Sequence, residues 1–277
     1  MSVDVSVTSR PTSAVEARLA TGDEIEHYHA FGWVKMERLF SPEVAAQMLV
    51  TAKAEILGKD ADGETSHSRK VWRDSYNLGR DRKIEPFQTL CRHENMGRNA
   101  QAFIRRNTSV AMHVDMLAVK MPAGVGGSAA TGYHQDFPNF PLDRNGLLTF
   151  WVALEDMTPE QGTMRFYSGS QHEVLGKFNL EADARGILDA SPFIEETYPL
   201  SPPLTLKAGD CTVHNSLVVH GAPDNITARP RWTYLMCYHP CDARWTGAPH
   251  HTFNADAGLT VGEPVSSPKF PVVYQAR

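Results

Sequence analysis

The second half of the chain alternates between short apolar runs and clusters of turn residues. From about position 110 onward, stretches rich in Val, Leu, Phe, Trp and Tyr are separated by Gly, Pro, Asn and Asp. The runs cover residues 113–121, 147–154, 163–167, 203–206, 211–214, 217–220 and 231–238. Short β-type runs between turn signals are typical of an antiparallel sandwich or jelly roll. The sequence therefore predicts a mainly β fold with a core at about residues 110–240.

The first hundred residues favour helices instead. Ser41 followed by Pro42 combines an N-cap residue with the residue preferred at the first helical position. Residues 33–36 read as a strand that follows a glycine-terminated helix. The expected helices span residues 23–31, 42–57 and 94–106. We expect them to form an α-helical layer on one face of the β core.

Residues 59–83 are polar and charged, with Trp72 and Tyr76 among them. A long segment of this composition without a hydrophobic period predicts a loop, and such loops often cover binding sites. Aromatic side chains in a covering loop offer apolar contact surface to a substrate. We therefore expect Trp72 and Tyr76 to lie at the entrance of a site, with anchoring of the loop into the core as the alternative.

Composition narrows the class of protein. The net charge of −5, from 27 Lys and Arg against 32 Asp and Glu, lacks the basic excess that nucleic acid binding requires. Four scattered cysteines do not form a disulfide framework, and no apolar run is long enough to cross a bilayer. We expect a cytoplasmic protein with no membrane partner, acting as a monomer or homodimer. After a disordered leader at residues 1–20, residues 21–277 are expected to form one domain.

His134, Gln135 and Asp136 place an imidazole and a carboxylate two positions apart, on the same face if the backbone is extended. His220, at the end of a separate β-type run, is the best candidate for a third ligand. Two histidines and one carboxylate leave open positions on the metal, the arrangement that non-haem iron(II) oxygenases use. A His-x-Asp pattern is weak evidence by itself, because lone histidines more often lie at the surface.

Arg231, eleven positions after His220, opens an alternating apolar run. A buried arginine at the start of a strand is costly unless it meets an anion. The distal carboxylate of a keto-acid cosubstrate would supply that anion and accept two hydrogen bonds from the guanidinium. The alternative is an edge position in which Arg231 pairs with a nearby Asp or Glu.

An ordered set of motifs resembles the phytanoyl-CoA dioxygenase-like (PhyH) oxygenases, some of which tailor bacterial secondary metabolites. The resemblance covers about residues 23–240 and follows the family's order and approximate spacing. The matching segments are residues 28–34, 39–43, 134–136, 151, 155–156, 161–164, 168–172, 209–210, 214–221 and 231.

The resemblance implies a double-stranded β-helix of the cupin-like jelly-roll type. It further implies that iron(II) is held by His134, Asp136 and His220, and that 2-oxoglutarate is anchored by Arg231. Additional cosubstrate contacts in the family match Met116, Trp151 and Thr149 here. The position two after the distal histidine, sometimes serine in relatives, is Ala222, so a hydroxyl contact is lost there.

The implied activity is a 2-oxoglutarate-dependent dioxygenase acting with dioxygen on an unactivated C–H bond of a small molecule. Succinate and CO2 are released, and the outcome is hydroxylation, radical cyclisation or epimerisation, as in antibiotic biosynthesis. Phe137 and Phe140, after the metal motif, are expected to join Trp72 and Tyr76 at the substrate entrance. An acyl-CoA or other lipid-like substrate is the first alternative. A non-redox, metal-dependent jelly-roll isomerase or binding protein is the second.

Other residues compete for these roles. His214 lies six positions before His220, but Asn215 and Ser216 are expected to break the strand, and only His220 has the family spacing to Arg231. The remaining histidines without a carboxylate partner are expected in loops or at the surface: His113, His172, His239, His250 and His251. Because Asp136 is present, halogenation is disfavoured. Zinc would accept the same ligands, but a zinc hydrolase would not need Arg231.

Overall fold

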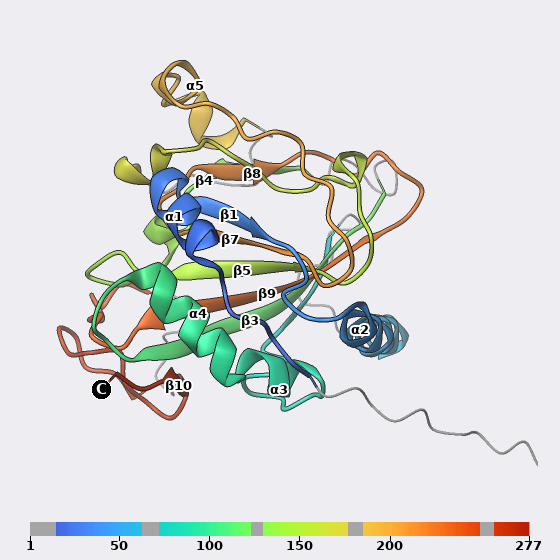
Figure 1. Ribbon diagram of the computed structural model, residues 1–277, viewed down its shortest axis with the longest axis horizontal. Helices are drawn as coiled ribbons and strands as arrows, with labels where there is room; N and C mark the ends of the chain where they lie inside the picture. Colours follow the sequence, from blue (N-terminus) through green and yellow to red (C-terminus); the bar gives the residue numbers. More distant parts are fainter. Residues whose placement is uncertain (1–14, 63–71, 123–129, 177–184, 250–257, 277) are drawn as a thin grey trace, which may run out of the picture.

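The computed structural model describes residues 15–62, 72–122, 130–176, 185–249 and 258–276 (Figure 1). Most of the predicted leader, residues 63–71 of the predicted loop, and His250 and His251 lie outside these ranges.

Two antiparallel sheets form the centre of the described structure. The larger sheet has the strand order β1-β7-β5-β9-β3-β10, and β2 also pairs with β3. Its strands are β1 (Trp33–Met36), β2 (Trp72–Tyr76), β3 (Val110–Lys120), β5 (Leu148–Ala153), β7 (Cys211–Asn215), β9 (Arg231–Pro240) and β10 (Val272–Tyr274). The smaller sheet has the order β4-β8-β6, with β4 (Thr131–His134), β6 (Arg165–Phe166) and β8 (His220–Ala222).

Helices cover one face of the larger sheet, as Figure 1 shows for α1 and α4. The helices with more than one turn are α1 (Gly22–Phe31), α2 (Pro42–Asp62), α3 (Phe87–Cys91), α4 (Glu94–Ile104) and α5 (Phe193–Thr197). Alternate strand residues such as Phe150, Tyr234 and Met236 pack with helical residues such as Met48 and Phe103 in one buried cluster. The other face of the sheet therefore turns toward the smaller sheet.

Local sequence explains where the first helices begin. Thr21 and Glu24 form a reciprocal capping box at the start of α1, and Gly32 ends the helix with a φ of 80°. The Ser41 hydroxyl accepts a hydrogen bond from the backbone of Val44 at the start of α2. These boundaries agree with the sequence prediction, because capping depends on residues within one turn of the helix end.

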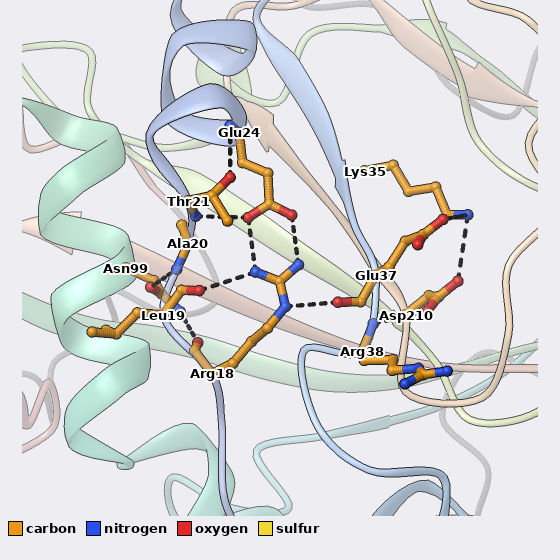
Figure 2. Close-up of polar contacts among 10 residues, drawn as sticks. All are labelled: Arg18, Leu19, Ala20, Thr21, Glu24, Lys35, Glu37, Arg38, Asn99 and Asp210. Carbon is orange, nitrogen blue, oxygen red and sulfur yellow. Dashed lines mark hydrogen bonds and ion pairs between the residues drawn. The ribbon is translucent and has the colours of Figure 1, made fainter.

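Residues 15–20, at the end of the predicted leader, lie against this helical layer (Figure 2). Ala17 is buried, and the Arg18 guanidinium donates to the Glu24 carboxylate and to the Glu37 carbonyl. The buried Asn99 amide on α4 accepts from the Ala20 backbone and donates to the Arg18 carbonyl. This segment therefore joins α1, α4 and β1.

Several local predictions were wrong. The loop expected at residues 59–83 contains the end of α2 and all of β2, whose pairing with the distant β3 leaves no local signal in the sequence. The run at 217–220 is a turn, and the strand begins only at His220. The run at 203–206 contributes a single bridge, Leu206 to Met157. The strands β4 and β10 were not predicted, since neither has an alternating apolar pattern.

His113 and His239 also differ from expectation, since both side chains are fully buried. Each lies in a central strand, His113 at an irregular position of β3 and His239 near the end of β9. Within the described part of the chain, no helix combines the length and apolar character needed to span a bilayer.

Candidate functional site

His134 and His220 lie directly opposite each other where β4 pairs with β8. Their ring centroids are 4.3 Å apart, and both side chains are buried. The Nδ1 atom of His134 is 2.8 Å from the Gly132 carbonyl, and that of His220 is 3.0 Å from the Val218 carbonyl. When each Nδ1 donates to its carbonyl, each Nε2 presents a lone pair to the space between the strands.

Asp136 reaches the same space through a turn rather than through an extended strand. The β4 strand ends at His134, and Asp136 has helical backbone angles, with φ −70° and ψ −39°. The buried Gln135 side chain anchors this turn by donating to the Glu173 and Leu217 carbonyls and accepting from the backbone of Leu175. The sequence prediction brought His134 and Asp136 together correctly, but its reason, alternation in extended backbone, was wrong.

The two oxygens of Asp136 have different surroundings. Oδ1 lies 3.4 Å from His134 Nε2 and 3.7 Å from His220 Nε2. Oδ2 lies 3.3 Å from His214 Nε2 and accepts a hydrogen bond of 3.3 Å from the Thr149 hydroxyl. The contacts from β5 and β7 therefore fix the carboxylate so that Oδ1 faces the two opposed histidines.

The protonation states suit metal binding. Burial alone would raise the pKa of Asp136, but interactions with His220, His134 and His214 outweigh it and hold the pKa well below its ordinary value. Burial, with His134 and His214 acting in the same direction, lowers the pKa of His220 well below its ordinary value. An ionised carboxylate and a neutral imidazole are the forms in which these side chains bind metals.

The three side chains fit a metal ion. One donor atom from each of His134, Asp136 and His220 lies within 4.8 Å of the others. Two imidazole nitrogens and one carboxylate oxygen are the donor set of non-haem iron(II) sites with open coordination positions. No other group of three or more His, Cys, Asp or Glu side chains in the described ranges has this geometry.

Arg231 begins β9 and is 1% exposed. Its guanidinium donates to the Gly162 carbonyl and lies 4.9 Å from the centroid of the Trp151 ring. Trp151 on β5 pairs with Leu235, which lies four residues after Arg231 on β9. To reach the Trp151 ring, the Arg231 side chain therefore extends along β9, in the direction of the paired residues Thr149 and Cys237. Burial lowers the pKa of Arg231 to about 9, and the nearby Asp74 acts in the opposite direction. The edge position considered as an alternative is excluded.

The other expected cosubstrate residues occupy the same face of the sheet. Leu235 lies opposite both Met116 and Trp151, and residues directly opposite in antiparallel strands share a face. The Trp151 side chain is buried, whereas Met116 is half-buried. The Thr149 hydroxyl contacts Asp136 and lies 3.3 Å from the Cys237 sulfur. A contact between Thr149 and the cosubstrate stays a prediction.

The expected substrate residues are divided between two places. Tyr76 on β2 pairs with Met116 and is 43% exposed, so it lies on the site's face of the sheet and is open to solvent. The backbone of Trp72 also belongs to β2, but its side chain is outside the described structure. Phe137 and Phe140 are half-buried beside a separate cluster that includes Phe270.

Three residues near the site were not assigned a role there from the sequence. His214 contacts the carboxylate of Asp136, and Gln135 holds the turn that carries it. Lys120, on β3, lies directly opposite Arg231. Gln135 and His214 could have been suspected from the sequence because they lie close to the predicted ligands. Nothing in the sequence pointed to Lys120, because its partner Arg231 is more than a hundred residues away along the chain.

A family profile and a sequence relative both match this chain over most of its length. The profile of the phytanoyl-CoA dioxygenase (PhyH) family matches residues 28–233. The probable alpha-ketoglutarate-dependent hypophosphite dioxygenase of Stutzerimonas stutzeri is 26% identical over 224 residues, which cover 76% of this chain and 76% of that protein.

Solved structures show the same fold. The carbocyclase SnoK from nogalamycin biosynthesis is 21% identical, with a TM-score of 0.72 over 91% of this chain and 96% of SnoK. The epimerase SnoN, in complex with Fe3+, alpha ketoglutarate and nogalamycin RO, is 23% identical, with a TM-score of 0.72 over 91% of this chain and 97% of SnoN. Both are alpha ketoglutarate-dependent enzymes, and the jelly-roll fold class predicted from the sequence is confirmed.

Proposed function

Because the chain belongs to the phytanoyl-CoA dioxygenase (PhyH) family of iron(II)- and 2-oxoglutarate-dependent oxygenases, we propose that it oxidises a C–H bond of a small organic molecule. The reaction consumes dioxygen and converts 2-oxoglutarate to succinate and CO2. The proposed setting is natural-product biosynthesis, where SnoK and SnoN act as a carbocyclase and an epimerase.

In this proposal, Nε2 of His134, Nε2 of His220 and Oδ1 of Asp136 hold the iron. His214 and Thr149 contact the other carboxylate oxygen, Oδ2, and so fix the orientation of Asp136. When bound, iron(II) and 2-oxoglutarate supply the dioxygen chemistry that no protein side chain can perform. The protein's contribution is to position the reactants and to exclude water from a buried site.

The observation that carries the proposal is the buried guanidinium of Arg231, which extends along β9 toward the three ligands. A metal-dependent hydrolase has no use for a buried cation at this place. A 2-oxo diacid does, because its distal carboxylate would accept hydrogen bonds from the guanidinium while its keto-acid end faced the metal held by His134, Asp136 and His220. The Trp151 ring, whose centroid lies 4.9 Å from the guanidinium, limits where this group can move.

Substrate is proposed to approach over the face that carries Tyr76. This tyrosine is partly exposed, and burial, Asp74 and Cys237 raise its pKa to about 12, so it stays protonated as a hydrogen-bond donor at neutral pH. Phe137 and Phe140 follow the ligand Asp136 by one and four positions but pack beside the separate cluster with Phe270, so a substrate contact from either stays a prediction. Aromatic side chains with one polar tip suit an organic substrate with both ring and hydroxyl groups.

The proposal is tested by the binding of 2-oxoglutarate and by its turnover. We expect the purified protein with iron(II) to bind 2-oxoglutarate and to form succinate when the substrate is supplied. Arg231→Ala should weaken 2-oxoglutarate binding by about 100-fold or more, because a charge pair is lost, while iron affinity changes less than about threefold. Arg229→Ala, an exposed neighbour in the same segment, is the matched control and should leave both affinities unchanged.

Equal loss of iron and 2-oxoglutarate binding in Arg231→Ala would assign Arg231 a structural role. A wild-type protein that binds iron but not 2-oxoglutarate would overturn the proposed function. We also propose a cytoplasmic location, in keeping with four free cysteines, and one domain that spans residues 21–277.

A further inference from the structure

Two buried cations lie side by side on the face of the larger sheet that turns toward the iron ligands. Lys120 on β3 and Arg231 on β9 are direct partners in the strand register. Lys120 is 0% exposed and Arg231 is 1% exposed. Opposed side chains in antiparallel strands have Cβ atoms about 5 Å apart and share a face of the sheet, so like charges in this position repel each other.

The charged ends of both side chains are directed to the same pair of loops. The Lys120 ammonium donates to the Pro223 carbonyl at 2.6 Å and lies 3.4 Å from the Ala222 carbonyl. The Arg231 guanidinium donates to the Gly162 carbonyl. A Cβ on Gly162 would lie 2.3 Å from the Pro223 carbonyl oxygen, so the two loops touch. The two cationic groups therefore converge at one place, beside the end of β8.

The point where the two cationic groups converge lies between the iron ligands and Arg231. Ala222 is two residues after His220 on β8, and its side chain packs in the cluster that contains Trp151. The guanidinium of Arg231 lies over the same Trp151 ring, 4.9 Å from its centroid. An anion held by Arg231 on the side of the iron ligands would thus lie within reach of the Lys120 ammonium.

Two buried cations this close to each other disfavour each other's charged form. Burial, and then the neighbouring Arg231, lower the pKa of Lys120 to about 6, while Asp224 acts in the opposite direction. Asp224 acts on Lys120 and Asp74 acts on Arg231, and both carboxylates are half-buried. A carboxylate placed between the two cations would relieve their repulsion and favour the charged form of the lysine.

We propose that Lys120 is a second cosubstrate-binding residue, whose ammonium binds the distal carboxylate of 2-oxoglutarate together with the Arg231 guanidinium. This inference rests on the proposed function. One oxygen of the carboxylate accepts a hydrogen bond from the guanidinium, and the other accepts one from the ammonium. The two donors lie on opposed strands, so each can reach a different oxygen of the same carboxylate. The ammonium thereby gives the site a preference for 2-oxo diacids over 2-oxo monoacids that is stronger than one arginine provides.

A structural role predicts something different. If Lys120 only ties β3 to the loop after β8 through the Pro223 carbonyl, its loss lowers the stability of the whole site. Keto acids with and without a distal carboxylate would then lose affinity to the same extent. The measurement that separates the two roles is therefore a ratio of affinities and not an activity.

The experiment compares 2-oxoglutarate with 2-oxopentanoate, which has the same chain length but no distal carboxylate. Affinities are measured by anaerobic calorimetry on the iron(II)-loaded protein, for wild type, Lys120→Met and Lys120→Gln. The glutamine variant retains a donor for the Pro223 carbonyl without the charge. We expect each variant to weaken 2-oxoglutarate binding by about tenfold or more and 2-oxopentanoate binding by less than about threefold.

Lys35→Met is the matched control, since Lys35 lies in β1 of the same sheet, paired with Glu37 and Asp210. It should leave both affinities unchanged. An equal loss for the two keto acids in the Lys120 variants, or no loss for either, would overturn the role of Lys120. A wild-type protein without any preference for 2-oxoglutarate over 2-oxopentanoate would instead overturn the proposed function. Arg231→Ala, measured in parallel, identifies which of the two has failed.

Discussion

In the part of the chain that the structure describes, two pairs of buried histidines come from neighbouring paired strands, and one of these pairs lies beside a carboxylate. His134 and His220 face each other across β4 and β8 with the Asp136 carboxylate between them. His113 and His239 face each other across β3 and β9, with their Nδ1 atoms 3.2 Å apart. Burial and residue type are the same in both pairs, so neither property by itself makes a metal site.

The difference lies in what surrounds each pair. At the first pair, backbone carbonyls face the Nδ1 atoms, and the Nε2 atoms point to a carboxylate. At the second pair, the rings contact Phe140 and Phe270, and the Arg80 guanidinium adds to burial in lowering the pKa of His239. A metal site needs an anionic donor and imidazole lone pairs that the metal can reach. Aromatic side chains and a nearby cation instead keep the two imidazoles neutral, as part of the packed interior.

The largest expected difference between the pairs is in iron affinity. His220→Ala or Asp136→Ala should weaken iron(II) binding by about 1,000-fold or more, because a three-residue site loses one of its donors. His239→Gln should change iron affinity by less than about twofold. Anaerobic metal titration of the four proteins measures this, after circular dichroism has shown that each is folded. Iron loss in His239→Gln comparable to that in His220→Ala would remove the distinction between the pairs.

The second pair should make stability depend on pH. Burial lowers the pKa of His239 from its ordinary value of 6.5 to about 4, so below pH 6.5 the unfolded chain binds a proton that the folded chain does not. The contribution of a neutral His239 to stability is complete above pH 6.5 and is lost as the pH falls toward 4. At roughly 1.4 kcal/mol for each pKa unit, the loss is about 3 kcal/mol.

This effect is measured by urea unfolding of wild type and His239→Gln at several values between pH 4 and 7. The glutamine variant, which does not titrate there, should lose about 3 kcal/mol less stability over this range. Buried groups that do not contact His239, His220 included, are common to both proteins and cancel in the difference, whereas His113 contacts His239 and titrates together with it. Parallel curves for the two proteins would mean that His239 carries a proton in the folded state.

The smallest expected effect belongs to His214, which contacts Asp136 without being one of the three proposed ligands. His214→Leu should weaken iron(II) binding by about tenfold, because residues that orient metal ligands typically account for 10- to 100-fold in affinity. Thr149→Val, which removes the other contact to Oδ2, should have a similar effect. Complete loss of iron in His214→Leu, with iron retained in His220→Ala, would reassign the third ligand.

The sequence by itself determined the elements that depend on neighbouring residues. Thr21 and Glu24 fixed the start of α1 through a capping box, and Ser41 with Pro42 fixed that of α2. The apolar runs fixed most strands of the larger sheet, because side chains alternate across a strand whatever it pairs with. The spacing of His134, Asp136, His220 and Arg231 identified the candidate site and the family.

Only the tertiary structure decided which side chains meet across the sheets. It gave Asp136 a turn in place of a strand, placed His214 against its second oxygen, and buried His113 with His239. It also set Lys120 opposite Arg231, at a separation of more than a hundred residues. Strand register depends on the packing of whole sheets, and a shift of one residue reverses every side chain, so no local pattern could have predicted these contacts.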